Sequence, residues 1–170
     1  MVIMNIYIAL RESWSAVVDA YREGHINSEC TLQSLMYAEL RERLSDHVIL
    51  CEPRISVESR ECFVPDIVVL RRHTVAAIVE IKFVPHSYPV YEDDLDKLKF
   101  LAEHQKNFPL LLDPHSGKFR PEYFRISADC ILAFAVIGRH DAAAVDPLGL
   151  GAAMWQFRDR FIPFIFRVGA

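Results

Sequence analysis

The chain lacks an excess of positive charge. Its 170 residues carry 19 Lys and Arg against 23 Asp and Glu, which gives a formal net charge of −4. Proteins that hold nucleic acid through their overall charge are basic, so this composition excludes a global basic surface for a polyanion. Any nucleic acid partner would have to be held by a local basic patch or through metal ions.

Long apolar runs are absent too. No stretch reaches the roughly 20 apolar residues that a membrane-spanning helix needs, so we expect no membrane partner. The start MVIMNIYIAL is apolar, but it carries no early basic residues and no small-residue cleavage site, so no signal peptide is expected. These absences predict a cytoplasmic protein.

Sequence motifs of several common enzyme classes are also missing. There is no CxxC pair, no HExxH, no P-loop, no GxGxxG and no GxSxG. The cysteines are scattered, so we expect them to be reduced and partly buried rather than bound to zinc. They are Cys30, Cys51, Cys62 and Cys130.

What remains is the composition of one globular domain over residues 1–170. The chain is 52% hydrophobic and 25% charged, and it shows no repeat, low-complexity tract or linker. Apolar residues recur at spacings of three and four over about 3–21, which predicts an N-terminal helix that ends near Gly24.

A second helix is expected to begin at Asn27 or Ser28, either of which can cap it. Its apolar stripe consists of Leu32, Leu35, Met36, Leu40 and Leu44. At about 100° per residue, Glu29 points along that stripe, whereas Glu39 lies at its edge. Glu29 is therefore expected to face the rest of the protein.

The remaining pattern predicts an α/β fold, a mixed β-sheet flanked by helices. The expected order is strands at about 47–57, 62–71 and 74–83, a helix at about 92–106, irregular chain over 107–128 and a strand at 130–138 buried on both faces. The aromatic tail MWQFRDRFIPFIFRV is expected to pack on the core as a last strand or helix, with a dimer surface as the alternative.

Two of the apolar strands carry charged residues that burial disfavours. Glu80 and Lys82 are two apart on one strand and therefore share a face. Asp66 follows Pro65 on the preceding strand, where the missing donor of proline is expected to bend or unpair the strand. If the two strands pair through the turn at 71–73, Asp66 and Glu80 lie nearly opposite each other.

Two carboxylates at that separation repel, and a hard divalent cation with oxygen ligands removes the conflict. Lys82 does not suit a ligand role, because an ammonium repels a metal ion. It suits a group that holds a water molecule or stabilises developing negative charge. A metal ion, a lysine and water together favour hydrolysis of a phosphodiester.

These residues resemble the motif of the PD-(D/E)XK nuclease superfamily, which includes the restriction endonucleases. The match consists of Pro65-Asp66, thirteen intervening residues and Glu80-Ile81-Lys82 on consecutive apolar strands. The resemblance covers about residues 27–138 and implies a restriction-endonuclease-like αβββαβ core. It further implies a Mg²⁺-dependent nuclease, with Mn²⁺ as a substitute, that cleaves nucleic acid and most often DNA as an endonuclease.

The resemblance also implies a role for each residue of the motif. Asp66 and Glu80 would bind the metal ion, with the Ile81 carbonyl as a further ligand. Glu29 would contribute directly or through water, and Lys82 would orient and activate the attacking water. The helix at 92–106 would pack beside this site and supply another polar residue, for which the candidates are Lys97 and Lys99.

Simpler interpretations stand beside these. The pair formed by Glu80 and Lys82 could be a salt bridge at an exposed sheet end, which would contribute little. Glu29 could be an acid that the helix dipole favours in a first turn. The turn residues could contact a phosphate backbone, but a solvated turn is favoured. They are Arg71, Arg72 and His73.

Two other functions remain open from the sequence. The chain could be a catalytically silent nuclease-like fold that acts as a binding or assembly module, which its acidic net charge favours. It could also be a nuclease subunit that needs a partner protein to bind DNA. A homodimer is a further possibility, by analogy with nucleases that cut both strands.

Overall fold

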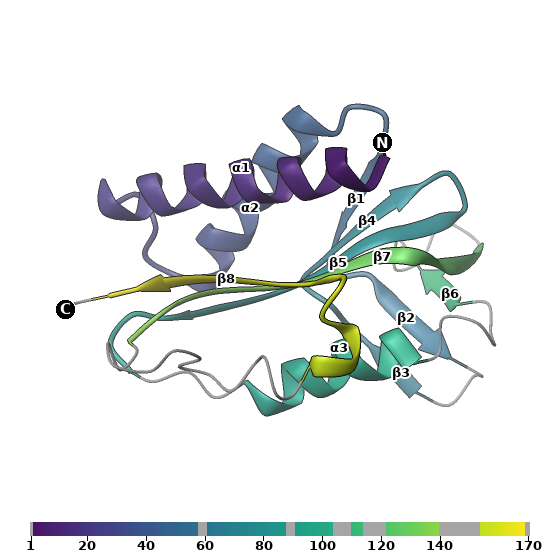
Figure 1. The fold of residues 1–170 in the computed structure, drawn as a ribbon. Helices are drawn as coiled ribbons and strands as arrows, with labels where there is room; N and C mark the ends of the chain where they lie inside the picture. Colours follow the sequence, from purple (N-terminus) through teal and green to yellow (C-terminus); the bar gives the residue numbers. More distant parts are fainter. Residues whose placement is uncertain are drawn as a thin grey trace.

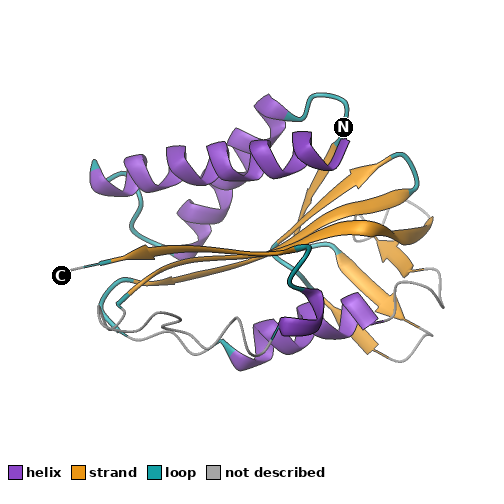
Figure 2. Cartoon of the chain, in the orientation of Figure 1, coloured by secondary structure: helices purple, strands orange, loops and turns teal. Residues whose placement is uncertain are grey.

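The structure is a computed structural model. It describes residues 2–57, 61–87, 91–103, 110–113, 122–139 and 154–168. Within these ranges the chain forms one eight-stranded sheet with helices on both faces (Figures 1 and 2). The helices are α1 (Val2–Arg22), α2 (Glu29–Arg43) and α3 (Glu92–Glu103), with a 3₁₀ turn, η1 (Trp155–Phe157). The strands are β1 (Val48–Cys51), β2 (Arg54–Val57), β3 (Glu61–Phe63), β4 (Ile67–Arg71), β5 (Thr74–Val84), β6 (Leu110–Asp113), β7 (Glu122–Gly138) and β8 (Phe161–Arg167).

The sheet is mixed, as predicted. Its strand order is β1-β4-β5-β7-β6-β2-β3, and β8 also pairs with β7. β4 runs antiparallel to β1 and β5, whereas β5 and β8 both run parallel to β7. Helices α1 and α2 cover one face and α3 covers the other (Figure 1). The prediction of an α/β fold with a mixed sheet flanked by helices is therefore confirmed.

The two N-terminal helices have the predicted ends. Gly24 follows α1 with a φ of 81°, a conformation that favours glycine, and so closes the helix. The Ser28 hydroxyl accepts a hydrogen bond from the Thr31 backbone N–H at 3.2 Å and caps α2. Glu29 is therefore the first residue of α2, and the cap fixes the direction in which the helix starts.

Two apolar cores lie on opposite faces of the sheet. Along β5, Val79 and Ile81 face the core beneath α1 and α2, and Ile78 faces the core beneath α3. Residues 130–138 of β7 are all buried, which confirms the prediction of a strand buried on both faces. This alternation places Glu80 and Lys82 on the α3 face.

The single strand predicted over 47–57 was wrong, because the chain breaks there into β1 and β2. Glu52 adopts a φ of 48°, and the next residue is Pro53, which cannot donate to a sheet ladder. β1 pairs with β4, whereas β2 pairs with β3 and β6. The residues on both sides of Glu52 favour strand, so the local sequence pattern did not indicate the corner that the backbone makes there.

The strand predicted over 62–71 is likewise two strands, β3 and β4, interrupted at Pro65 and Asp66. The prediction of irregular chain over 107–128 was wrong where the structure describes it, because β6 and the first part of β7 lie there and pair. The helix predicted over 92–106 is described as far as Glu103. Residues 104–106 and most of the predicted turn DPHSG lie outside the described residues.

The aromatic C-terminal segment packs on the core. β8 lies parallel to β7, and its Phe164 ring is 6.0 Å from the ring of Trp14 on α1. Within the described ranges, no helix combines the length and apolar character that crossing a membrane requires. The described cysteines are free thiols, with Cys130 buried and Cys30 and Cys51 exposed, while the side chain of Cys62 lies outside the described residues.

Candidate functional site

Asp66 occupies the break between β3 and β4, beside β5. Its Oδ2 accepts a hydrogen bond from the Ile81 backbone N–H at 2.6 Å. Its own carbonyl accepts two more, from Gln33 Nε2 and from the Glu52 N–H, each at 3.0 Å. The interruption that Pro65 introduces therefore turns a potential ladder residue into a fixed carboxylate next to Glu80.

Glu80 is buried beneath α3 with only 2% of its surface exposed. One of its oxygens, Oε2, lies 3.7 Å from Lys97 Nζ on α3. The other, Oε1, is buried and has no hydrogen-bond partner among the described residues. A buried carboxylate oxygen without a donor is costly, so this position is one where a cation or water would stabilise the protein.

Lys82 points to the same face as Glu80, as the two-residue spacing predicted. Its ammonium forms an ion pair with Asp94 Oδ2 at 2.7 Å, and Asp94 Oδ1 accepts a hydrogen bond from Lys97 at 3.0 Å. The simple pair of Glu80 with Lys82 at an exposed sheet end is therefore not observed. Each lysine instead takes one oxygen of a carboxylate that α3 supplies.

Asp94 is a site residue that the sequence interpretation missed. It lies in an acidic first turn of α3, where the helix dipole was a sufficient reason for an acid. A signal was present, because Asp94 precedes Leu98 by four residues and Leu101 by seven and so lies on the buried stripe of α3. Asp94 is buried, whereas Asp93 and Asp96 are exposed.

Glu29 reaches the site from the start of α2. Its Oε2 accepts a hydrogen bond from the Phe83 backbone N–H at 3.0 Å, across 54 residues of sequence. Glu39, the alternative, pairs with Arg43 on its own helix instead. Of the two helix glutamates, Glu29 is thus the one that contacts β5. Lys99 has no ion pair with any described residue, so Lys97 is the α3 lysine that joins the site.

Burial and nearby negative charges raise the pKa of both central carboxyls. Burial raises the pKa of Asp66 to about 6, against the lowering effect of its hydrogen bond from Ile81, and nearby Glu29 raises it further. Burial also raises the pKa of Glu80 to about 9, with the Asp66 charge as the next cause. The Asp66 charge thus makes Glu80 harder to ionise, in the direction expected for two neighbouring carboxylates.

The pKa values of the two lysines are raised as well, which favours their charged form. Burial lowers the pKa of Lys82, but its hydrogen bond and charge interaction with Asp94 outweigh burial, so the pKa is raised. Burial likewise lowers the pKa of Lys97, and the charge of Glu80 together with Asp94 outweighs it. Both side chains therefore remain ammonium groups near neutral pH.

The donor set suits a hard divalent cation in its chemistry. Carboxylate oxygens are the ligands that Mg²⁺ prefers, and the partnerless Oε1 of Glu80 is available for one. Among the described residues, however, no three His, Cys, Asp or Glu side chains are gathered as a ready ligand group. The residues fit a metal site whose carboxylates would have to turn toward the ion.

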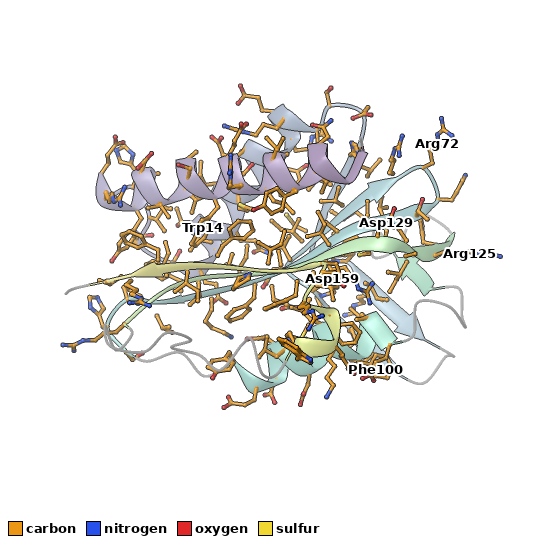
Figure 3. The ribbon with its side chains drawn as sticks, in the orientation of Figure 1. Trp14, Arg72, Phe100, Arg125, Asp129 and Asp159 are labelled. Atoms are coloured by element: carbon orange, nitrogen blue, oxygen red, sulfur yellow. The ribbon has the colours of Figure 1, made fainter. Side chains whose placement is uncertain are left out.

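The basic turn lies at the other end of β5. Arg71, Arg72 and His73 are exposed, and Thr74 is separated from Lys82 by about 26 Å of extended strand. Figure 3 shows Arg72 and Arg125 at the same end of the molecule, where the Arg125 N–H donates to the His73 carbonyl at 3.2 Å. The turn is therefore not part of the carboxylate site.

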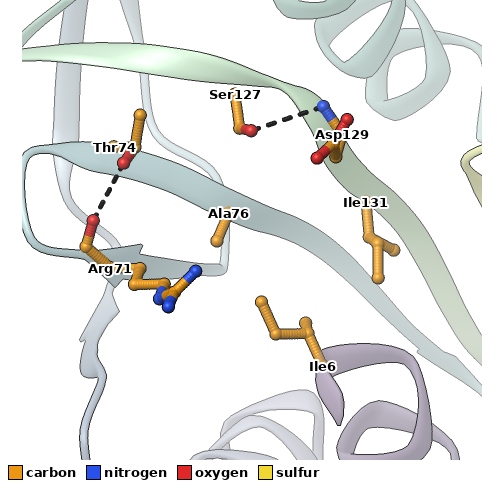
Figure 4. Close-up of a pocket in the computed structure, with 7 residues that line it drawn as sticks. All are labelled: Ile6, Arg71, Thr74, Ala76, Ser127, Asp129 and Ile131. Atoms are coloured by element: carbon orange, nitrogen blue, oxygen red, sulfur yellow. Dashed lines mark hydrogen bonds between the residues drawn. The ribbon is translucent and has the colours of Figure 1, made fainter. Parts of the chain in front are cut away.

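A shallow hollow lies at that same end, between the start of α1 and the sheet (Figure 4). The Thr74 hydroxyl donates to the Arg71 carbonyl at 2.9 Å, and the Asp129 N–H donates to Ser127 Oγ at 3.3 Å. The residues that line this hollow include none of those in the carboxylate site. Its polar groups are partly satisfied by one another.

No protein-family model, curated protein or solved structure matches this chain. What the site does must therefore be inferred from its own residues. Those residues bring together the buried Glu80 carboxyl, the half-buried Asp66 carboxyl, a second glutamate and two lysines bound to one aspartate.

Proposed function

We propose that this chain is a metal-dependent nuclease of the PD-(D/E)XK type, with DNA as its expected substrate. One observation carries the proposal. The buried Glu80 carboxyl keeps one oxygen without a hydrogen-bond partner among the described residues, while Asp66 and the Lys97 ammonium lie beside it. Such a site is unfavourable by itself and becomes favourable when a divalent cation is added.

The order of the elements supports the family. Leaving out α1, the strands β2, β3 and β6, and the C-terminal η1 and β8, the chain order is α2, β1, β4, β5, α3, β7. This order agrees with the αβββαβ order that the resemblance implies, which supports the proposal. Asp66 immediately precedes β4 and Glu80 lies within β5, and these two consecutive strands pair with each other.

Asp66 and Glu80 would hold Mg²⁺ or Mn²⁺, with Glu29 and the Ile81 carbonyl as further ligands. The ion, when bound, would supply Lewis-acid activation of a water molecule and of the phosphate. Asp66 would keep its direction through the Ile81 N–H, because that hydrogen bond ties the carboxylate to the backbone of β5. Glu29 would be held in the same way by Phe83.

Lys82 would act on the attacking water and on the phosphate. An ammonium has three donors, and Asp94 occupies one of them. The Lys82 side chain is 24% exposed, so its remaining donors can reach a substrate from the solvent side. Hydrolysis joins the water oxygen to phosphorus and releases the 3′ oxygen as an alcohol, while Lys82 stabilises the negative charge that develops.

The proposal is tested by incubating plasmid DNA with Mg²⁺ and the wild-type protein, Asp66→Ala, Lys82→Ala and the control Lys99→Ala. We expect cleavage by the wild type and the control, and losses of at least about a hundredfold in the other two. Lys82→Ala should retain metal binding. Parallel reactions with RNA decide the substrate. Equal cleavage by all four proteins would end the hypothesis.

A binding or assembly module is the second candidate. The absence of a gathered ligand group in the described residues favours it, as does the net charge of −4. Such a module need take up no Mg²⁺ or Mn²⁺, and calorimetry would show none. A nuclease that depends on a basic partner protein would bind metal but would show no salt-sensitive DNA binding alone. The cytoplasmic location and the homodimer also remain predictions.

A further inference from the structure

Helix α3 places a lysine at the carboxylate that the proposed function assigns to the metal ion. Lys97 Nζ lies 3.7 Å from Glu80 Oε2 and 3.0 Å from Asp94 Oδ1. Its side chain is 33% exposed, so the ammonium lies between the buried Glu80 and the solvent. Glu80, in contrast, is almost completely buried and depends on what the protein brings to it.

The geometry of α3 explains how the lysine is held. Asp94 and Lys97 are three residues apart, so they lie on neighbouring turns of one helix face. Leu98 and Leu101 are fully buried and fix that face against the sheet. Lys97 is closer to Asp94 than to Glu80. The ammonium therefore interacts more strongly with its own helix, α3, than with β5.

The two lysines of the site therefore differ in what they touch. Lys82 binds the other oxygen of Asp94, at 2.7 Å, and no ion pair between Lys82 and Glu80 is present in the described structure. Lys97 is the cation that contacts Glu80. A cation in that position stabilises a buried carboxylate, and it would also repel a divalent ion bound to the same carboxylate.

We infer that Lys97 is the internal counter-ion of the metal-free site, and that a divalent cation binds by displacing its ammonium from Glu80. Asp94 retains the displaced ammonium at the rim, since its hydrogen bond to Lys97 does not involve the proposed ligands. The inference rests on the proposed function. Its consequence is that Lys97 stabilises the protein without metal and weakens its affinity for metal.

The test compares wild type, Lys97→Met and the matched control Lys99→Met, which removes an ammonium from the same helix outside the carboxylate site. Calorimetric titration with Mn²⁺ should show binding about tenfold tighter for Lys97→Met than for wild type. Without metal, Lys97→Met should unfold at a lower temperature than wild type, and Mn²⁺ should raise its Tm by more. Lys99→Met should match wild type in both measurements.

A second variant keeps the test decisive if Lys97→Met does not fold. Lys97→Arg retains the charge and should bind Mn²⁺ as wild type does, whereas Lys97→Gln should bind more tightly. Unchanged or weaker Mn²⁺ binding by a folded Lys97→Met or Lys97→Gln protein would overturn the inference while leaving the metal site standing. No Mn²⁺ binding by any protein, wild type included, would overturn the inference and the proposed function together.

Discussion

Single residues in this site differ in how well they are compensated. Asp66 has a backbone donor and Asp94 has two ammonium groups, whereas Glu80 has one distant ammonium and one oxygen with no described partner. Charges that are buried and incompletely paired are unfavourable for stability, and groups of this kind are typical of functional sites. Because Asp94 contacts both ammonium groups, it is the residue that sets the positions of both lysines.

Replacing Asp94 with Asn should remove the anion that holds Lys82. We expect DNA cleavage to fall by about 10- to 100-fold, the usual cost of losing a group that orients a site residue. Asp93→Asn is the matched control, because Asp93 is exposed and adjacent on α3. The measurement is the rate of plasmid nicking at saturating Mg²⁺. Full activity in Asp94→Asn would show that Lys82 needs no such anchor.

The raised pKa values of Asp66 and Glu80 predict how stability depends on pH without metal. A carboxyl whose pKa is higher in the folded than in the unfolded chain favours folding while it is protonated. That contribution is complete below about pH 4 and is lost as pH rises through about 6 for Asp66 and about 9 for Glu80. The free energy of unfolding should therefore fall between pH 5 and pH 9.

Urea denaturation in chelator at several pH values measures this dependence. Glu80→Gln keeps the shape of the side chain and removes its titration, so its curve should be flatter by a few kcal/mol over the range. Glu103→Gln, an exposed exchange on α3, should follow the wild type. A wild-type curve that rises with pH, or equal slopes in all three proteins, would contradict the assignment.

At the scale of elements, β5 connects everything in the site. From Ala77 onward its odd residues face α1 and α2 and its even residues face α3, so one strand presents Glu80 and Lys82 to a helix while Ile81 stays in the opposite core. The break between β3 and β4 supplies Asp66, and α2 supplies both Glu29 and a hydrogen bond that holds the Asp66 backbone. The site is a junction of β5, the β3–β4 break, α2 and α3 rather than a single loop.

Parts of this junction could be predicted from the sequence, and the reason is local. A two-residue period places Glu80 with Lys82, and a short turn at 71–73 places Asp66 opposite them. Asp94 was not predicted, because an acid in a first helical turn has an adequate local explanation. The corner at Glu52 and the strand in β6 depend on pairing between distant segments, which the local pattern does not encode.

The contact between α2 and the Asp66 backbone gives a prediction at this scale. Gln33→Ala removes the side-chain donor to the Asp66 carbonyl, so we expect a loss of about 1 kcal/mol in stability and several-fold weaker Mn²⁺ binding. Ser34→Ala, on the exposed side of the same helix, should change neither. Urea denaturation and calorimetry measure the two effects. Wild-type Mn²⁺ affinity in Gln33→Ala would show that α2 does not position Asp66.

At the scale of the whole molecule, two cores on opposite faces hold one sheet, and the C-terminal strand packs side chains against both of them. Phe164 of β8 is buried against Trp14, so β8 closes the core beneath α1 (Figure 1). This packing holds β7 between two parallel neighbours, β5 and β8. Glu80 and Lys82 thus lie on β5, whose neighbour β7 is paired on its other side with β8.

Phe164→Ala should therefore cost about 3–5 kcal/mol of unfolding free energy, the usual loss for a buried phenylalanine. Trp155 provides the contrast, because 65% of it is exposed, and Trp155→Ala should change stability by less than about 0.5 kcal/mol. Urea denaturation of the two variants measures both values. A small loss in Phe164→Ala would mean that β8 is not needed for the core.

The central claim is that a divalent cation binds Asp66 and Glu80 and compensates their negative charges. Calorimetric titration of Mn²⁺ into the wild type and into Glu80→Gln measures this most directly, because the exchange removes the carboxylate that would bind the ion and preserves the shape of the side chain. The account predicts saturable binding to the wild type and its loss, or a weakening of at least about tenfold, in Glu80→Gln. Equal binding by the two proteins, or none by the wild type, would contradict it.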